Sequence, residues 1–97
     1  MIVVTMTQSS LTIDGHAARP AGVPAGNNIV CAAVSALTLT LIEGMRAVAG
    51  MRIDTEERDG RIRIGWMQMN EKGRALLDTW LIGIQNIRDS YGEITIL

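Results

Sequence analysis

The sequence is poor in several features on which common classes of small protein depend. Its 97 residues include one cysteine, one histidine, two prolines and no phenylalanine. A single cysteine cannot form an internal disulfide, and residues 1–10 carry no basic segment ahead of an apolar core. We therefore expect a cytoplasmic protein with a reduced thiol. One cysteine and one histidine without a further ligand cluster cannot complete a structural metal site, so no metal or cofactor is predicted.

An excess of charge of either sign is also lacking. Nine basic side chains stand against ten acidic ones, without a basic block, which gives little support to a nucleic-acid partner. The longest uncharged run covers residues 21–42, but its first part is rich in glycine, proline and asparagine. The remaining apolar run, 29–42, is typical of a buried core helix, so no membrane partner is predicted.

The apolar periodicity predicts one domain over residues 1–97 with the element order β-β-α-β-β-α-β. Strands are expected at 1–8, 11–16 and 92–97, a hairpin at 52–67 with its turn at Asp59-Gly60, and helices at 29–49 and 71–90. Asn28 and Asn70 are the expected helix caps. This order predicts an α+β fold, a single mixed or antiparallel sheet with both helices packed on one face.

Two further expectations concern the core. The apolar residues of the first helix cover much of its circumference, which predicts a helix buried on several sides: Ile29, Val30, Ala33, Val34, Leu37, Leu41 and Met45. Trp66 and Trp80 lie on predicted core faces, whereas Arg61 and Arg63 share the opposite, solvated strand face.

The only histidine and the only cysteine lie at the two ends of a Pro/Gly-rich segment, residues 17–27. His16 ends a strand, and Cys31 lies in the first turn of a helix, where free backbone N–H groups and the helix dipole favour a thiolate. A nearby imidazole would make this pair a nucleophile with its base. The alternative interpretation is that Cys31 packs as a small apolar residue and that His16 is merely solvated.

The segments Gly15-His16-Ala17 and Ile29 to Leu37, "IVCAAVSAL", resemble the ribosomal-processing cysteine proteases, the Prp family. The resemblance implies a small homodimeric fold with Cys31 as nucleophile and His16 as base. It also implies a protein substrate, either a large-subunit ribosomal protein or a phage capsid or scaffold protein. The extension removed from that substrate would end in aromatic residues.

Two departures from the family pattern bear on this resemblance. The family normally has aspartate where this chain has Asn28, which keeps the cap but removes a negative charge beside the thiol. The asparagine could also orient the imidazole of His16, as could Asp14, which is predicted on the same strand face. The loop formed by residues 18–27 is longer and richer in proline and glycine than the usual family loop. The identity of the substrate is therefore undecided, and a phage or prophage relative is a serious alternative.

Other residues are assigned supporting roles. Ser35 lies one turn after Cys31 and either orients the substrate or bonds to the carbonyl four residues back. Gly15, Ala17 and Gly26 are assigned to the substrate-binding loop, where the glycines let the backbone turn sharply or approach the substrate.

The sequence thus predicts a cysteine endopeptidase that uses a Cys31/His16 dyad, with first-turn N–H groups of the helix as candidate oxyanion donors. The main alternative is a homodimeric protein-binding module of the same fold that has lost activity. A thiol redox protein is a third class, which the absence of a resolving cysteine disfavours.

Overall fold

The computed structural model describes residues 1–17 and 28–97. Its elements are β1 (Ile2–Met6), β2 (Ser10–Gly15), α1 (Ile29–Ala47), β3 (Ile53–Arg58), β4 (Arg61–Trp66), α2 (Glu71–Tyr91) and β5 (Ile94–Ile96). The predicted element order and α+β class are confirmed.

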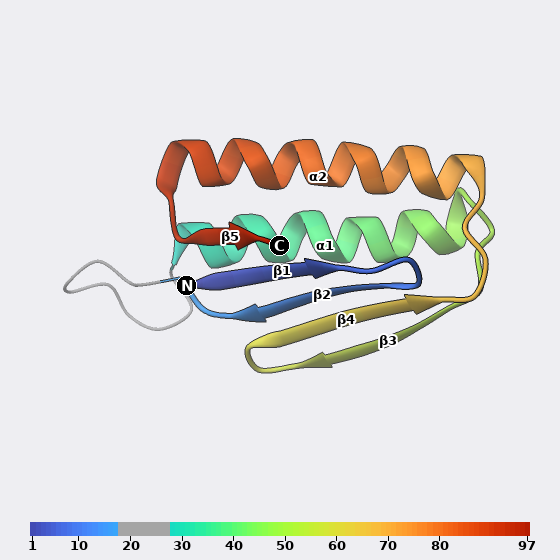
Figure 1. The fold of residues 1–97 in the computed structure, drawn as a ribbon, viewed down its shortest axis with the longest axis horizontal. Coiled ribbons are helices and arrows are strands. Elements are labelled where there is room, and N and C mark those ends of the chain that lie inside the picture. Colours follow the sequence, from blue (N-terminus) through green and yellow to red (C-terminus); the bar gives the residue numbers. More distant parts are fainter. Residues whose placement is uncertain (18–27) are drawn as a thin grey trace.

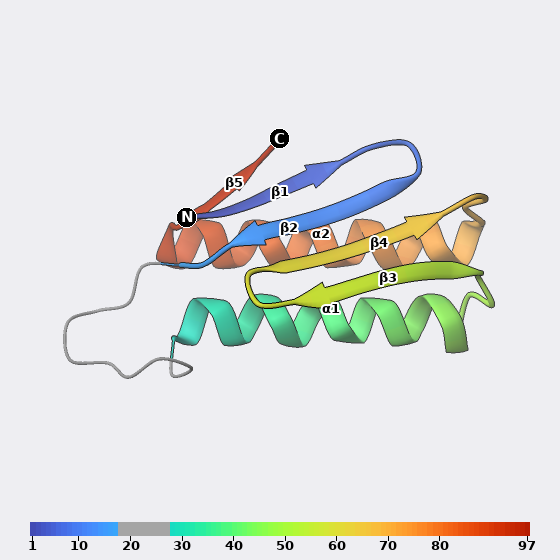
Figure 2. The same cartoon turned by 90° about the horizontal axis from the view of Figure 1, so that it is seen from below.

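The five strands form one mixed sheet in the order β3-β4-β2-β1-β5. Four of them pair antiparallel, while β5 lies parallel to β1 at one edge. The two helices run antiparallel to each other and cover the same face of the sheet (Figures 1 and 2). The fold therefore has two layers, as the sequence predicted.

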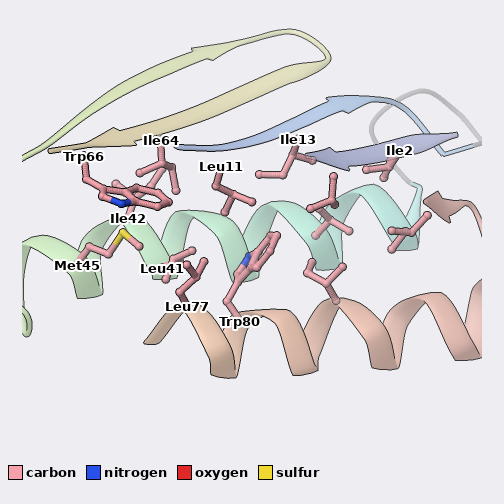
Figure 3. Close-up of a cluster of buried hydrophobic side chains, with 14 of the residues drawn as sticks. Ile2, Leu11, Ile13, Leu41, Ile42, Met45, Ile64, Trp66, Leu77 and Trp80 are labelled. Carbon is pink, nitrogen blue, oxygen red and sulfur yellow. The ribbon is translucent and has the colours of Figure 1, made fainter. Parts of the chain in front are cut away.

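The core lies between the sheet and the helix pair (Figure 3). Alternate strand residues, such as Leu11 and Ile64, point inward and are completely buried, and Met45 and Leu77 meet them from the helices. Both tryptophans are in this core, as predicted. Trp80 donates its indole N–H to the buried hydroxyl of Thr38 across the helix pair at 3.2 Å, so the polar edge of the ring is satisfied.

The first helix is buried on fewer sides than the sequence predicted. Ile29 is 61% exposed and Leu39 is 44% exposed, and the helix ends at Ala47 rather than at residue 49. In a two-layer fold a helix contacts the sheet along one side and its partner helix along another, which leaves a third side in solvent. By length and composition alone α1 could cross a membrane, a test that the core helices of soluble proteins also pass.

The outer face of the sheet carries ion pairs. Arg61 donates to Asp14 at 2.7 Å and to Glu56 at 3.2 Å, and Arg63 donates to Asp54 at 3.1 Å. The hydrogen bond to Asp14, followed by the charges of Asp14 and Glu56, raises the pKa of Arg61, so its guanidinium stays protonated at any physiological pH. The arginines are thus partly exposed and paired rather than freely solvated.

The predicted hairpin turn determines where the site lies. Gly60 has φ +74°, the left-handed conformation that favours glycine, whereas Asp59 before it does not have a positive φ, the pattern of a type II turn. Its carbonyl accepts the N–H of Gly15 at 2.8 Å. This bond extends the β2–β4 pairing beyond Asp14 and Arg61, and so fixes the hairpin tip against the end of β2.

Candidate active site

An open cleft of about 700 Å³ lies at the end of the molecule where β2 ends, α1 begins and the β3–β4 hairpin turns. These three segments lie at the same end in Figures 1 and 2. The cleft is lined by Ile2, Ile13, Gly15, His16, Ala17, Asn28, Cys31, Ala32, Val34, Ser35, Arg58, Asp59, Gly60, Arg61 and Ile62. All the site residues predicted from the described part of the chain, except Asp14, therefore line one cleft.

Cys31 is the third residue of α1, immediately behind the cap. The side-chain oxygen of Asn28 accepts the N–H of Val30 at 2.9 Å and that of Cys31 at 3.2 Å. Asn28 is only 6% exposed. The cap predicted from sequence is confirmed. It fixes the first turn of α1, which carries the half-buried Cys31 thiol.

The backbone of Ala17 joins the cap and the thiol. Its N–H donates to the Cys31 sulfur at 3.4 Å, and its carbonyl accepts the side-chain N–H of Asn28 at 3.2 Å. An N–H directed at sulfur stabilises a thiolate more than a thiol, because the anion is the stronger acceptor. Ala17, assigned to the substrate loop, is buried beside Cys31, and its backbone supplies these contacts.

His16 presents an imidazole that is 60% exposed at the cleft. Its Nε2 lies 3.6 Å from a carboxylate oxygen of Asp59, at the hairpin tip. The backbone carbonyl of His16 accepts a hydrogen bond from the N-terminal ammonium group of Met1 at 2.6 Å. Within residues 1–17 and 28–97, no hydrogen bond joins the imidazole to the Cys31 thiol. The two groups line the same cleft without a hydrogen bond between them.

Asp14, expected to orient the imidazole, instead holds Arg61 on the outer face of the sheet. The reason is the conformation of Gly15, whose φ of +95° ends the strand's alternation before His16. A side chain at Gly15 would overlap the carbonyl of Met1, so this turn requires glycine. The carboxylate beside His16 is that of Asp59, which the sequence marked only as part of a turn.

Ser35 is exposed on the cleft wall one helical turn after Cys31. Thr38 and Thr40 bond to the carbonyls four residues earlier, but among the described residues Ser35 makes no such bond. Ser35 lines the cleft without such a bond, so its hydroxyl is available to a ligand there. Gly26 lies outside the described residues.

Three N–H groups at the start of α1 are already hydrogen-bonded in this state. Those of Val30 and Cys31 go to the Asn28 side chain, and that of Ala32 goes to the Asn28 carbonyl at 3.0 Å. The cap satisfies them because unpaired N–H groups at a buried helix end are costly. These three N–H groups can therefore bind an oxyanion only after the cap rearranges on substrate binding.

Comparison with known proteins identifies the family and supports the fold. The model of a protein family, cysteine protease Prp, matches residues 1–95. This chain belongs to the Prp family of cysteine proteases. The resemblance noticed in two short segments thus extends over nearly the whole sequence. A search of the curated proteins gave no match.

Solved structures of Prp proteins have the same fold. The ribosomal processing protease Prp of S. aureus, in complex with a covalently linked product peptide, superposes with a TM-score of 0.81 at 24% identity, covering 98% of this chain and 94% of that one. The S. aureus protease with a substrate peptide gives 0.79 at 24% identity, covering 99% and 95%. A protein from Streptococcus mutans gives 0.71 at 26% identity, covering 98% and 89%.

Proposed function

We propose that this chain is a cysteine endopeptidase that removes an N-terminal extension from a specific protein, with Cys31 as nucleophile and His16 as its base. The observation that carries the proposal is that these two side chains, the only cysteine and the only histidine, line one cleft in a chain of the Prp family. The N–H of Ala17 on the sulfur adds local stabilisation for a thiolate.

The reaction follows the usual course for a thiol protease. The imidazole of His16 takes the Sγ proton, and the thiolate attacks the scissile carbonyl carbon to form a C–S bond. The imidazolium then returns the proton to the leaving nitrogen as the C–N bond breaks, and water hydrolyses the acyl-enzyme. No hydrogen bond joins the imidazole to the thiol in this structure, so the proposal requires substrate binding to bring them within hydrogen-bond distance. Catalytic hydrogen bonds are often long without substrate and tighten only in the complex.

The substrate is proposed from the family and from the walls of the cleft. The S. aureus relative is a ribosomal processing protease crystallised with substrate and product peptides, which supports a peptide substrate here. Ile2, Ile13 and Ile62 line the cleft, and such apolar walls suit a segment that ends in aromatic residues. A ribosomal protein and a phage capsid or scaffold protein both fit this chemistry. A homodimer, a phage or prophage origin and a cytoplasmic location stay predictions.

A catalytically impaired binding module of the same fold is the second candidate. It is favoured by Asn28 in place of the family aspartate and by the lack of a bond between imidazole and thiol. In this alternative the cleft binds the same protein segment but does not cut it.

The deciding experiment uses internally quenched peptides whose N-terminal part ends in two aromatic residues, followed by mass spectrometry of the fragments. The endopeptidase cuts after the aromatic pair, whereas Cys31→Ala and His16→Ala do not cut although they keep the circular dichroism of the wild type. Binding of the same peptides without cleavage by the wild type would establish the binding module instead. If the protein cleaves none of the peptides, but peroxide abolishes its binding of them and a thiol reductant restores that binding, a redox protein is indicated.

A further inference from the structure

The tip of the β3–β4 hairpin makes three contacts around His16. A carboxylate oxygen of Asp59 lies 3.6 Å from the imidazole Nε2. The ring also packs on Gly60, where an added Cβ would lie 2.9 Å from Nε2. The bond from the Gly15 N–H to the Gly60 carbonyl holds this tip beside the residue that precedes His16.

We propose that Asp59 is a positioning residue for His16, a role that rests on the proposed function. Its carboxylate keeps Nε2 turned toward the hairpin and leaves Nδ1 as the ring nitrogen that exchanges the proton with Cys31. When the imidazole takes the proton from Sγ it becomes a cation, and the carboxylate stabilises that cation without accepting the proton. Asp59 acts through His16 and does not touch the reacting atoms.

The charges near His16 single out Asp59. Arg58 and Arg61 also line the cleft, but both are held by Glu56, at 3.3 Å and 3.2 Å, and Arg61 is held by Asp14 as well. Asp59 is the one acidic side chain within ion-pair distance of the imidazole in the described part of the chain. Residues 18–27 contain no aspartate or glutamate, so they offer no substitute.

The expected effect is modest because the Asp59 side chain is 98% exposed. Exposed ion pairs contribute little and are screened by salt, so loss of the carboxylate should slow the reaction of the thiol about two- to fivefold at low ionic strength. The carboxylate also repels a thiolate directly. In a protein without the imidazole, removing the Asp59 carboxylate should therefore leave the reaction rate of the Cys31 thiol unchanged or raise it slightly.

Asp59→Asn tests this with little risk to the fold, because asparagine has nearly the same shape as aspartate and is likewise common in turns. The matched control is Asp54→Asn, which removes the same charge from β3 and also breaks an exposed ion pair, with Arg63 on the outer face. Since Cys31 is the only cysteine, its rate of alkylation by iodoacetamide at pH 7 reports on this thiol alone.

In 20 mM salt, alkylation of Cys31 should be about two- to fivefold slower in Asp59→Asn than in the wild type, whereas Asp54→Asn should keep the wild-type rate. The difference should disappear in 0.5 M NaCl. In the His16→Ala background Asp59→Asn should cause no slowing, which makes a double-mutant cycle. A purely structural role for Asp59 would leave the slowing in place at high salt and in the absence of His16.

The outcomes separate the two proposals. If His16→Ala slows alkylation but Asp59→Asn behaves like Asp54→Asn, the role of Asp59 is overturned and the dyad stands. If His16→Ala leaves both alkylation and peptide cleavage unchanged, the dyad and the role of Asp59 fall together. If His16→Ala abolishes cleavage without slowing alkylation, the pair forms only with substrate, and kcat/KM for the quenched peptide decides the role of Asp59: Asp59→Asn should lower it about two- to fivefold and Asp54→Asn should not, and equal values for the two variants overturn the proposal. A slowing by Asp59→Asn that salt does not reduce also overturns the proposal.

Discussion

The two helices begin with the same local chemistry at opposite ends of the molecule (Figure 1). Each has an asparagine cap, Asn28 for α1 and Asn70 for α2, whose side-chain oxygen accepts the N–H of the third helical residue. That residue is Cys31 in α1, at 3.2 Å, and Gly73 in α2, at 2.7 Å. Each asparagine also donates its side-chain N–H to a backbone carbonyl earlier in the chain, that of Ala17 for Asn28 and that of Ala49 for Asn70.

The surroundings of the third residue differ. The Cys31 side chain opens onto the cleft and receives the N–H of Ala17. At Gly73 there is no room for a side chain, since a Cβ would overlap the sulfur of Met51 and lie 2.9 Å from that of Met69. A capped helix N-terminus is therefore not a site by itself. It becomes one where tertiary structure leaves space beside it and brings a donor and a base to that space.

The largest expected difference between the two positions is in activity. Cys31→Ala should abolish peptide cleavage, because no other described side chain can replace the thiol, while the free energy of unfolding changes by about 1 kcal/mol or less. Cleavage is followed with the quenched peptide and stability by urea denaturation. Residual cutting by Cys31→Ala would place the nucleophile elsewhere.

Gly73→Ala should show the reverse pattern. The added methyl group meets two methionine sulfurs, and such overpacking costs about 1–3 kcal/mol of stability. Alkylation of Cys31 in the folded protein should keep its wild-type rate, since α2 begins at the other end of the molecule. An unchanged urea midpoint would show that the methionines move aside freely.

The two caps should contribute similarly to stability but differently to the thiol. Asn28→Ala and Asn70→Ala should each cost about 1 kcal/mol, the usual effect of losing an N-cap side chain. Only Asn28→Ala should change the alkylation rate of Cys31, because Asn28 holds both the first turn of α1 and the carbonyl of Ala17. Equal effects of both variants on the thiol would contradict this.

The smallest effect is expected for Asn28→Asp, which restores the residue typical of the family. A carboxylate keeps the cap and interacts favourably with the helix dipole, a gain of about 0.3–1 kcal/mol. It cannot donate to the Ala17 carbonyl, a loss of about 1 kcal/mol. The net change in stability should be below about 1 kcal/mol by urea denaturation, and a much larger change of either sign would contradict this balance of the two effects.

Much of the fold was predictable because it depends on local signals. Asn28 and Asn70 cap helices through bonds that span two or three residues, and Asp59-Gly60 makes a turn by its own backbone preference. Strand alternation placed Ile64 and Trp66 in the core. The exposed side of α1 was missed because its apolar residues surround the helix, and only the number of layers decides which of them are covered.

In the candidate site, too, some features depend on local sequence and others on the fold. The sequence by itself determined which side chains are available for chemistry, namely one thiol in a capped first turn and one imidazole at a strand end. Only the tertiary structure decided their neighbours, because Gly15 ends the alternation before His16 and the β2–β4 register brings the hairpin tip to the cleft. Asp14 therefore meets Arg61, Asp59 meets His16, and the Ala17 N–H meets the sulfur, contacts that join residues 14 to 47 positions apart in the chain.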